Sequence, residues 1–181
     1  MRICLTGGIA CGKSLLSSYL NALGIETLDA DDVVHGLIPD PAERKRIAAE
    51  VFSDPEKRKA LEARLHPLVK ERISAFLQPP TSNLRPRIAV IPLLFEVQWQ
   101  SDYDIICCIA STRENQISRM MTKRGYSRDE AEARLAAQLP VEDKAAKSHY
   151  VIRNDGSSED LKKEAERFVA WLQSRVKDNR S

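Results

Sequence analysis

A motif typical of phosphate-binding loops lies near the start of the chain. Residues 5–14 read L-T-G-G-I-A-C-G-K-S and contain the spacing G-x-x-x-x-G-K-S, with an apolar run before it and a helical pattern after it. Glycines at this spacing let successive backbone N–H groups point inward, and the following helix presents its positive end to a phosphate. The motif therefore predicts a nucleotide site in which Lys13 reaches the β- and γ-phosphates and the Ser14 hydroxyl ligates Mg²⁺.

Carboxylates gather directly after the next apolar segment. Asp29, Asp31 and Asp32 follow a short predicted strand at residues 27–28. Parallel strands deliver their carboxyl ends to one edge of a sheet, so these side chains should reach the edge that holds the phosphate loop. Phosphoryl transfer to a hydroxyl needs a carboxylate that orients the nucleophile and accepts its proton, and residues two apart in extended chain point the same way. Asp29 and Asp31 are therefore the candidates, while Asp32 is expected to cap the next helix.

Arginine and lysine side chains are concentrated between residues 113 and 134. Guanidinium groups can clamp the charge that spreads over the oxygens of a transferred phosphoryl group. Arg119 and Arg124 lie nearest Gly125, which separates two short helical patterns as the hinge of a closing lid would. Acidic residues are interleaved with the basic ones, so the alternative for each arginine is an ion pair on a solvent-exposed helix face.

Two isolated residues, His66 and Cys11, could contact a ligand or react. His66 precedes Pro67 at an interruption of a helical pattern, where a single histidine is more often structural than ligand-binding. Cys11 lies inside the phosphate loop near a helix N-terminus, which can lower the pKa of a thiol. We therefore expect alkylation of Cys11 to block nucleotide binding and ATP to protect it. The four cysteines show no C-x-x-C spacing, which disfavours metal and disulfide roles.

Short apolar segments alternate with helical patterns and must position these side chains. Helical stretches between strands indicate a parallel sheet of the α/β class, and near-continuous apolar runs indicate strands buried on both faces. The expected strands are residues 2–6, 27–28, 87–91, 104–110 and 150–152. The expected helices are residues 15–23, several within 33–78, 112–123, 127–138 and a closing amphipathic helix from 161.

Particular residues mark where these elements begin and end. Gly24 is expected to end the first helix, and Ser127 with Glu130 forms a capping-box signature. Residues 53–56 carry a second such signature, and residues 65–67 are expected to break the helical pattern. Residues 79–86 form a polar, proline-rich connection.

The bulk composition limits the classes of partner. The 181 residues suit one hydrophobic core with small appendages. With 28 Lys and Arg against 26 Asp and Glu, the formal charge of +2 gives no overall field for nucleic acid or a membrane surface. The sequence shows neither a leader pattern nor an apolar run long enough to span a bilayer, so we expect a cytoplasmic protein.

The order of short motifs along the chain resembles that of the dephospho-CoA kinases. After the phosphate loop come D-A-D at 29–31, L-E-x-x-L-H-P at 61–67, P-L-L-F-E at 92–96, R-x-x-x-x-R-G-x-S-x-x-E-A-x-x-R-x-x-x-Q at 119–138 and V-I-x-N-x-G at 151–156. Each motif alone is modest, but the ordered set spans nearly the whole chain and is highly specific.

The resemblance implies a nucleoside-monophosphate-kinase-like P-loop NTPase fold. In that fold a five-stranded parallel sheet carries a helical substrate insertion and a lid. The P-loop core would be residues 1–32, 84–112 and 150–181. Residues 33–83 would form the helical dephospho-CoA-binding insertion, and residues 113–149 the lid and its flanking helices. A monomer is favoured over a trimer.

The resemblance also implies the reaction, which is ATP-dependent phosphorylation of the ribose 3′-hydroxyl of dephospho-CoA to coenzyme A, the last step of its biosynthesis. Asp31 is then the catalytic base, with Lys13, Arg119 and Arg124 as further catalytic residues. The implied ATP-binding residues are Gly7, Gly8, Ile9, Ala10, Cys11, Gly12, Lys13, Ser14, Leu15 and Asn154. The implied substrate-binding residues are Asp29, Asp31, His66, Leu94 and Glu96, and the implied Mg²⁺ ligand is Ser14.

The chain departs from the family pattern in three places. Ala10 and Cys11 stand in the phosphate loop where the family often has glycine and serine, which should be tolerated because those positions mainly contribute backbone N–H groups. The stretch between Asp31 and Leu61 is shorter than in typical relatives, so we expect the pantetheine side of the substrate pocket, but not the phosphate chemistry, to differ from theirs. Ser148 and His149 stand where Ala and Asp are usual. The alternatives are a P-loop kinase for another small hydroxylated or nucleotide substrate, and a non-catalytic ATP-binding module.

Overall fold

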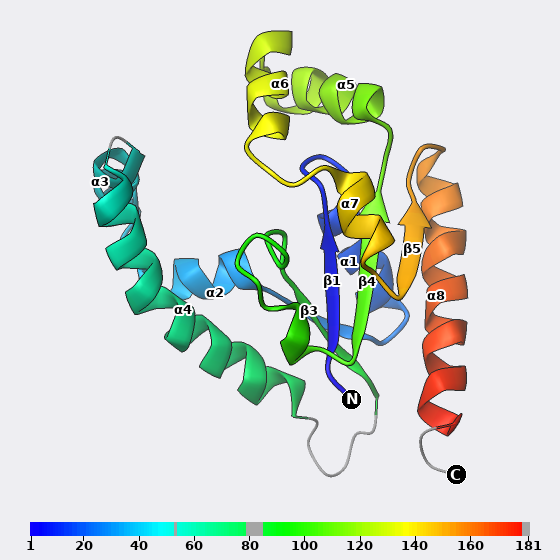
Figure 1. Ribbon diagram of the computed structural model, residues 1–181. Helices are drawn as coiled ribbons and strands as arrows, with labels where there is room; N and C mark the ends of the chain where they lie inside the picture. Colours follow the sequence, from blue (N-terminus) through cyan, green and yellow to red (C-terminus); the bar gives the residue numbers. More distant parts are fainter. Residues whose placement is uncertain (53, 79–84, 179–181) are drawn as a thin grey trace.

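Five parallel strands form a single sheet in the order β2-β3-β1-β4-β5 (Figure 1). The computed structural model describes residues 1–52, 54–78 and 85–178. The strands are β1 Ile3–Gly7, β2 Glu26–Asp29, β3 Arg87–Val90, β4 Ile105–Ala110 and β5 Tyr150–Arg153. Every residue of β1 and β4 is buried, as their continuous apolar runs predicted. The predicted five-stranded parallel sheet is confirmed.

Alternate residues of β1, β3 and β4 build two separate cores, one on each face of the sheet. Ile3 and Leu5 of β1 belong to the core under α1 (Lys13–Ala22) and α8 (Ser158–Asp178), whereas Cys4 belongs to the core under α4 (Pro55–Leu77). The sheet is thus covered on both sides, and its carboxyl edge stays free for a site. None of the helices in the described part of the chain has the length and apolar character needed to cross a bilayer.

The helix α4 runs unbroken through Pro67 for 23 residues, so the expected break at 65–67 is wrong. Proline removes one helical hydrogen bond and crowds the carbonyl four residues earlier. On the C-terminal side of Pro67, however, Val69, Ile73 and Leu77 are buried in the second core. We infer that this packing outweighs the local cost.

The start of α4 confirms only part of the predicted capping pattern. The side chain of Asp54 accepts the N–H groups of Glu56 and Lys57 and so caps the helix. Ser53 lies outside the described residues, as does most of the predicted connection 79–86. Two shorter helices, α2 (Ala30–Leu37) and α3 (Pro41–Phe52), precede α4. Figure 1 shows α3 and the N-terminal part of α4 lying away from the sheet, while the C-terminal part of α4 lies against it.

Two helices form an arch over the carboxyl edge of the sheet (Figure 1). They are α5 (Arg113–Arg124) and α6 (Arg128–Ala136). Gly125 ends α5 in a left-handed conformation with φ of 69°, and the Ser127–Glu130 capping box starts α6, both as predicted. A short helix, α7 (Val141–Ala146), then packs against β4 and β1. No hydrophobic periodicity predicted α7, because a helix of six residues is too short to show one.

Candidate active site

The phosphate loop connects β1 to α1 and is curled by two left-handed residues. Ala10 has φ of 57° and Gly12 has φ of 101°. The Lys13 ammonium lies inside the curl, where it donates to the carbonyl oxygens of Gly7 at 3.0 Å and Gly8 at 2.9 Å. Burial lowers the pKa of Lys13, and the nearby positive charge of Lys144 acts in the same direction. The loop therefore already surrounds the Lys13 ammonium, which can exchange these carbonyl oxygens for phosphate oxygens.

Ala10 holds a conformation that a residue with a Cβ adopts only at a cost. The cost of a left-handed residue is about 1–2 kcal/mol, and glycine avoids it while losing about 0.5–1 kcal/mol in chain entropy. We expect Ala10→Gly to raise the free energy of unfolding by about 0.5 kcal/mol, measured by urea denaturation. Leu15→Gly, inside α1, should lower it and serves as the control for added chain entropy. If Ala10→Gly lowered the free energy of unfolding, the inference that Ala10 is strained would be wrong.

A cavity of about 430 Å³ opens beside this loop. Eight of the predicted site residues line it, and three further residues do so that the sequence did not single out for the site. The predicted ones are Ala10, Gly12, Lys13, Ser14, Leu15, Arg119, Arg124 and Asn154. The others are Lys123, Gly156 and Ser158. The N-terminal end of α1, the glycine-rich loop and four cationic side chains thus line one cavity, which suits a nucleoside triphosphate.

The remaining loop residues do not face this cavity with their side chains. Gly7 and Gly8 are buried at the end of β1, and Ile9 lines a separate cavity of about 340 Å³ on the side of α7. Cys11 is fully buried in the first core. Burial raises the pKa of Cys11, against the opposing effect of Lys13. The expectation of a reactive thiol is therefore wrong, because desolvation outweighs the helix N-terminus.

The aspartates after β2 have different structural roles from those predicted. Asp29 accepts the N–H of Asp31 at 2.9 Å and caps α2, so Asp29 and not Asp32 is the cap. Because α2 begins at Ala30, Asp31 lies in the first helical turn and not in extended chain. Burial raises the pKa of Asp29. The charges of Asp29 and Asp31 both act on Lys13 and raise its pKa, against the larger effect of burial.

A second cavity, apolar and of about 180 Å³, lies between α2, α4 and the segment after β3. Asp31 and His66 both line it, so the structure brings these two predicted residues together. The His66 ring packs edge-on against Trp99 with centroids 5.0 Å apart. Lys70 lies over the same indole and pairs with Asp102 at 2.7 Å. His66 is thus held by packing while its cavity-facing side is available to a ligand.

Three predicted substrate residues do not line this cavity, namely Asp29, which caps α2, and two residues that follow β3. Leu94 is fully buried in the second core, and its neighbour Leu93, 41 % exposed, lines the cavity instead. Glu96 turns toward α7, where its Oε1 accepts from Lys144 Nζ at 2.6 Å and from the Leu139 N–H at 3.2 Å. The structure therefore gives Leu94 and Glu96 packing and anchoring contacts. A turn has no regular alternation from which these directions could have been predicted.

Lys144 is the functional candidate that the sequence did not reveal. Its side chain is completely buried, and its ammonium donates to the Pro92 carbonyl at 3.0 Å as well as to Glu96. Through these contacts α7 holds both ends of the segment 92–96, which includes Leu93 of the second cavity. A lone lysine in a short charged stretch carries no local signal of burial.

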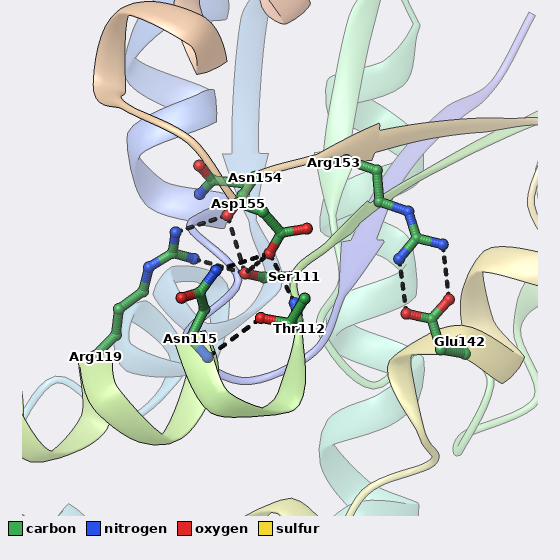
Figure 2. A network of polar contacts seen from close by, with 8 residues as sticks. All are labelled: Ser111, Thr112, Asn115, Arg119, Glu142, Arg153, Asn154 and Asp155. Atoms are coloured by element: carbon green, nitrogen blue, oxygen red, sulfur yellow. Dashed lines mark hydrogen bonds and ion pairs between the residues drawn. The ribbon is translucent and has the colours of Figure 1, made fainter.

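A network of polar contacts joins the end of β4 to the end of β5 beside the nucleotide cavity (Figure 2). Asp155 Oδ1 accepts from Ser111 Oγ, the Thr112 N–H and Asn115 Nδ2 at 2.7–3.0 Å. Burial opposes ionisation of Asp155, but these three hydrogen bonds together hold its pKa below the usual range. Arg119 donates to the Asn154 carbonyl at 2.6 Å within the same network. The base of α5 is thereby fixed to the cavity wall.

Other charged residues of this region pair at the surface, as the alternative interpretation allowed. Arg128 contacts Glu114 at 3.0 Å and Glu132 at 3.3 Å, and Arg113 lies 3.8 Å from Glu132. Arg153 and Glu142 form a bidentate pair at 2.7 Å between β5 and α7 (Figure 2). Exposed pairs of this kind contribute little to stability.

Ser148 and His149, which stand where Ala and Asp are usual, have a structural role directly before β5. His149 Nδ1 accepts the Ile106 N–H at 3.0 Å, and the His149 N–H donates to the Ile106 carbonyl at 2.8 Å. An aspartate carboxylate could accept the same hydrogen bond, so the imidazole can replace it as an acceptor. Ser148 Oγ donates to the Lys144 carbonyl and closes α7.

Comparison with known proteins agrees with this site. The family model described as dephospho-CoA kinase matches residues 1–42 and 41–160. The two matched segments meet within the interval from Asp31 to Leu61, where the sequence departs from typical relatives. The dephospho-CoA kinase of Wolinella succinogenes is 34% identical over 190 residues, which cover 94% of each chain.

Solved structures place the fold in the same group. The crystal structure of TT1252 from Thermus thermophilus has a TM-score of 0.78 and 33% identity, covering 95% of this chain and 97% of its own. Shikimate kinase from Acinetobacter baumannii, at a TM-score of 0.66 and 16% identity over 96% and 93%, shares the P-loop kinase fold alone. With the phosphate loop, Asp31 and the second cavity in place and the family model matching most of its length, this chain belongs to the dephospho-CoA kinase family.

Proposed function

We propose that this protein transfers the γ-phosphate of ATP to the ribose 3′-hydroxyl of dephospho-CoA, giving coenzyme A and ADP. Family membership supports the reaction. The observation that carries the assignment to this site is the position of Asp31, which lines the apolar cavity while its charge acts on Lys13 of the phosphate loop. One carboxylate thus reaches both the region of the donor phosphates and the region of an acceptor.

In this proposal ATP occupies the cavity of about 430 Å³. Lys13 exchanges the carbonyl oxygens of Gly7 and Gly8 for the β- and γ-phosphates. Arg119 and Arg124, which line the cavity, stabilise charge on the transferred group and exclude water when the lid closes. Asp31 orients the 3′-hydroxyl for in-line attack and accepts its proton.

The residues present fit a magnesium ion that ATP brings with it. Ser14 is exposed in the first turn of α1 and lines the nucleotide cavity, where its hydroxyl could serve as a ligand. No cluster of three His, Cys, Asp or Glu side chains suited to a metal occurs among residues 1–52, 54–78 and 85–178. A single hydroxyl ligand from Ser14 is compatible with Mg²⁺, which commonly binds through substrate phosphates and few protein ligands. When bound, the ion neutralises charge on the phosphates.

The acceptor is proposed to bind on the side of residues 33–83, with residues 113–149 as lid and the other segments as core. Asp31 and His66 would contact it in the apolar cavity, whereas Asp29, Leu94 and Glu96 would act by supporting the walls. The two cavities are lined by residues of this chain, and a monomer is the oligomeric state that we propose.

A coupled assay of ADP release tests the proposed function. Dephospho-CoA should stimulate ADP release strongly, while nucleoside monophosphates and shikimate should not. Stimulation by one of the other acceptors would identify a different P-loop kinase. Tight ATP binding with no acceptor-dependent ADP release would instead favour a non-catalytic ATP-binding module.

Adjacent leucines allow the acceptor cavity to be tested with a matched pair. Leu93→Ala removes an exposed side chain from the cavity wall, so the KM for dephospho-CoA should rise about fivefold, equivalent to roughly 1 kcal/mol of apolar contact. Leu94→Ala should instead lower the free energy of unfolding by about 3 kcal/mol, because that side chain is fully buried. Steady-state kinetics and urea unfolding of both variants provide the measurement. Equal effects of the two on KM would contradict the assignment.

A further inference from the structure

Three successive carbonyl groups of the phosphate loop are each held by a side chain from outside the loop. Gln116 Nε2 donates to the Ile9 carbonyl at 2.7 Å, and Arg119 Nη1 donates to the Ala10 carbonyl at 3.3 Å. Asn154 Nδ2 donates to the Cys11 carbonyl at 2.8 Å. Gln116 and Arg119 lie on α5, and Asn154 directly follows β5, so two separate elements hold the loop.

These contacts determine where the N–H groups of the loop point. A trans peptide directs its C=O and the following N–H in opposite directions. Holding the oxygens of residues 9–11 on the outside therefore fixes the N–H groups of residues 10–12 on the other side of each peptide plane. Inward N–H groups are what an anion-binding loop uses to hold phosphate.

Two glycines of the loop leave room for the two amide side chains. A Cβ on Gly8 would lie 2.6 Å from Gln116 Nε2, and a Cβ on Gly12 would lie 2.4 Å from Asn154 Nδ2. Gln116 is only 3 % exposed and Asn154 only 7 %. Each amide is thus packed directly on the loop backbone, where water cannot easily replace it.

We propose that Gln116 is a positioning residue for the phosphoryl donor. It sets the phosphate loop through the Ile9 carbonyl and does not touch the nucleotide. This inference rests on the proposed function in one respect, namely that the loop binds the phosphates of ATP. Arg119 and Asn154 also line the nucleotide cavity, whereas the described lining of that cavity does not include Gln116. Substitution of Gln116 therefore tests the positioning of the loop without removing a direct contact with ATP.

The variant Gln116→Met tests this assignment. Methionine has a similar length but no donor, so the Ile9 carbonyl loses its partner. Loss of one buried hydrogen bond should weaken ATP binding about tenfold. Adenosine, which has no phosphate, should lose less than twofold. Calorimetric titration of the full chain with ATP and, separately, adenosine measures both.

Control variants separate this effect from general loss of stability. Val169→Ala removes buried methyl groups from α8 and should lower the melting temperature while leaving the ratio of ATP to adenosine affinity unchanged. Equal weakening of both ligands by Gln116→Met, or no weakening of ATP, would overturn the inference. Because the readout is nucleotide binding without acceptor, failure of dephospho-CoA phosphorylation would count against the proposed function alone.

A second variant keeps the test decisive if Gln116→Met does not fold. Gln116→Glu keeps the size of the side chain, but an ionised carboxylate cannot donate, whereas a protonated carboxyl can. Relative to the unaltered protein, its ATP affinity should recover as the pH falls from mildly alkaline to mildly acidic. If the ratio of the variant's ATP affinity to that of the unaltered protein stayed constant across that pH range, a donor role for Gln116 would be contradicted.

Discussion

Replacement of Asp31 by asparagine is expected to lower turnover about a thousandfold, while ATP binding persists. A positioned general base contributes on the order of 10²–10⁴ in rate, and an amide cannot accept the proton of the attacking hydroxyl. ATP should still bind, because the phosphate loop and its cavity are built from other residues. Single-turnover kinetics with dephospho-CoA and calorimetric titration with ATP measure the two quantities separately.

Asp29 offers the matched control for this experiment. Its carboxylate caps α2, and asparagine is about as good an N-cap as aspartate, so Asp29→Asn should keep both fold and most activity. If Asp29→Asn lost turnover and Asp31→Asn kept it, the catalytic base would be Asp29. If neither variant changed turnover by more than a few fold, general-base catalysis by this cluster would be rejected.

The spacing of loop residues predicted the phosphate site because its geometry is local. The eight positions 7–14, from the end of β1 into the first turn of α1, set the curl of the loop, the start of the helix and the place of Lys13, so the residue order alone carried the information. The capping residues Ser127 and Gly125 were predictable for the same reason, since each acts within four residues of its own position.

Features that depend on distant parts of the chain could not be predicted. Pro67 argued for a break, and only the packing of α4 on the sheet shows why the helix continues. Gln116 reaches Ile9 across 107 positions, so no local pattern could reveal the contact. The reactivity predicted for Cys11 is wrong for a related reason, because its burial depends on α1 and the sheet together and not on the loop alone.

Loss of the buried pair between Lys144 and Glu96 is the other large effect that we expect. Lys144→Met leaves Glu96 with a carboxylate whose Oε2 is buried and has no hydrogen-bond partner in the described part of the chain. Removing one member of a buried ion pair costs about 3–5 kcal/mol. Because Glu96 is 20 % exposed, we expect the lower figure, about 3 kcal/mol, in the free energy of unfolding.

A double-mutant cycle shows whether this cost belongs to the pair. Glu96→Gln alone leaves the buried ammonium without an opposite charge but keeps an acceptor for the Leu139 N–H, and combination with Lys144→Met removes both charges. The double variant should be about 2 kcal/mol more stable than the sum of the single losses predicts. Urea unfolding of the four proteins measures the coupling, and strictly additive losses would show that the pair is not coupled. Since α7 holds the segment 92–96 through this pair, the single variants should also raise the KM for dephospho-CoA more than the KM for ATP.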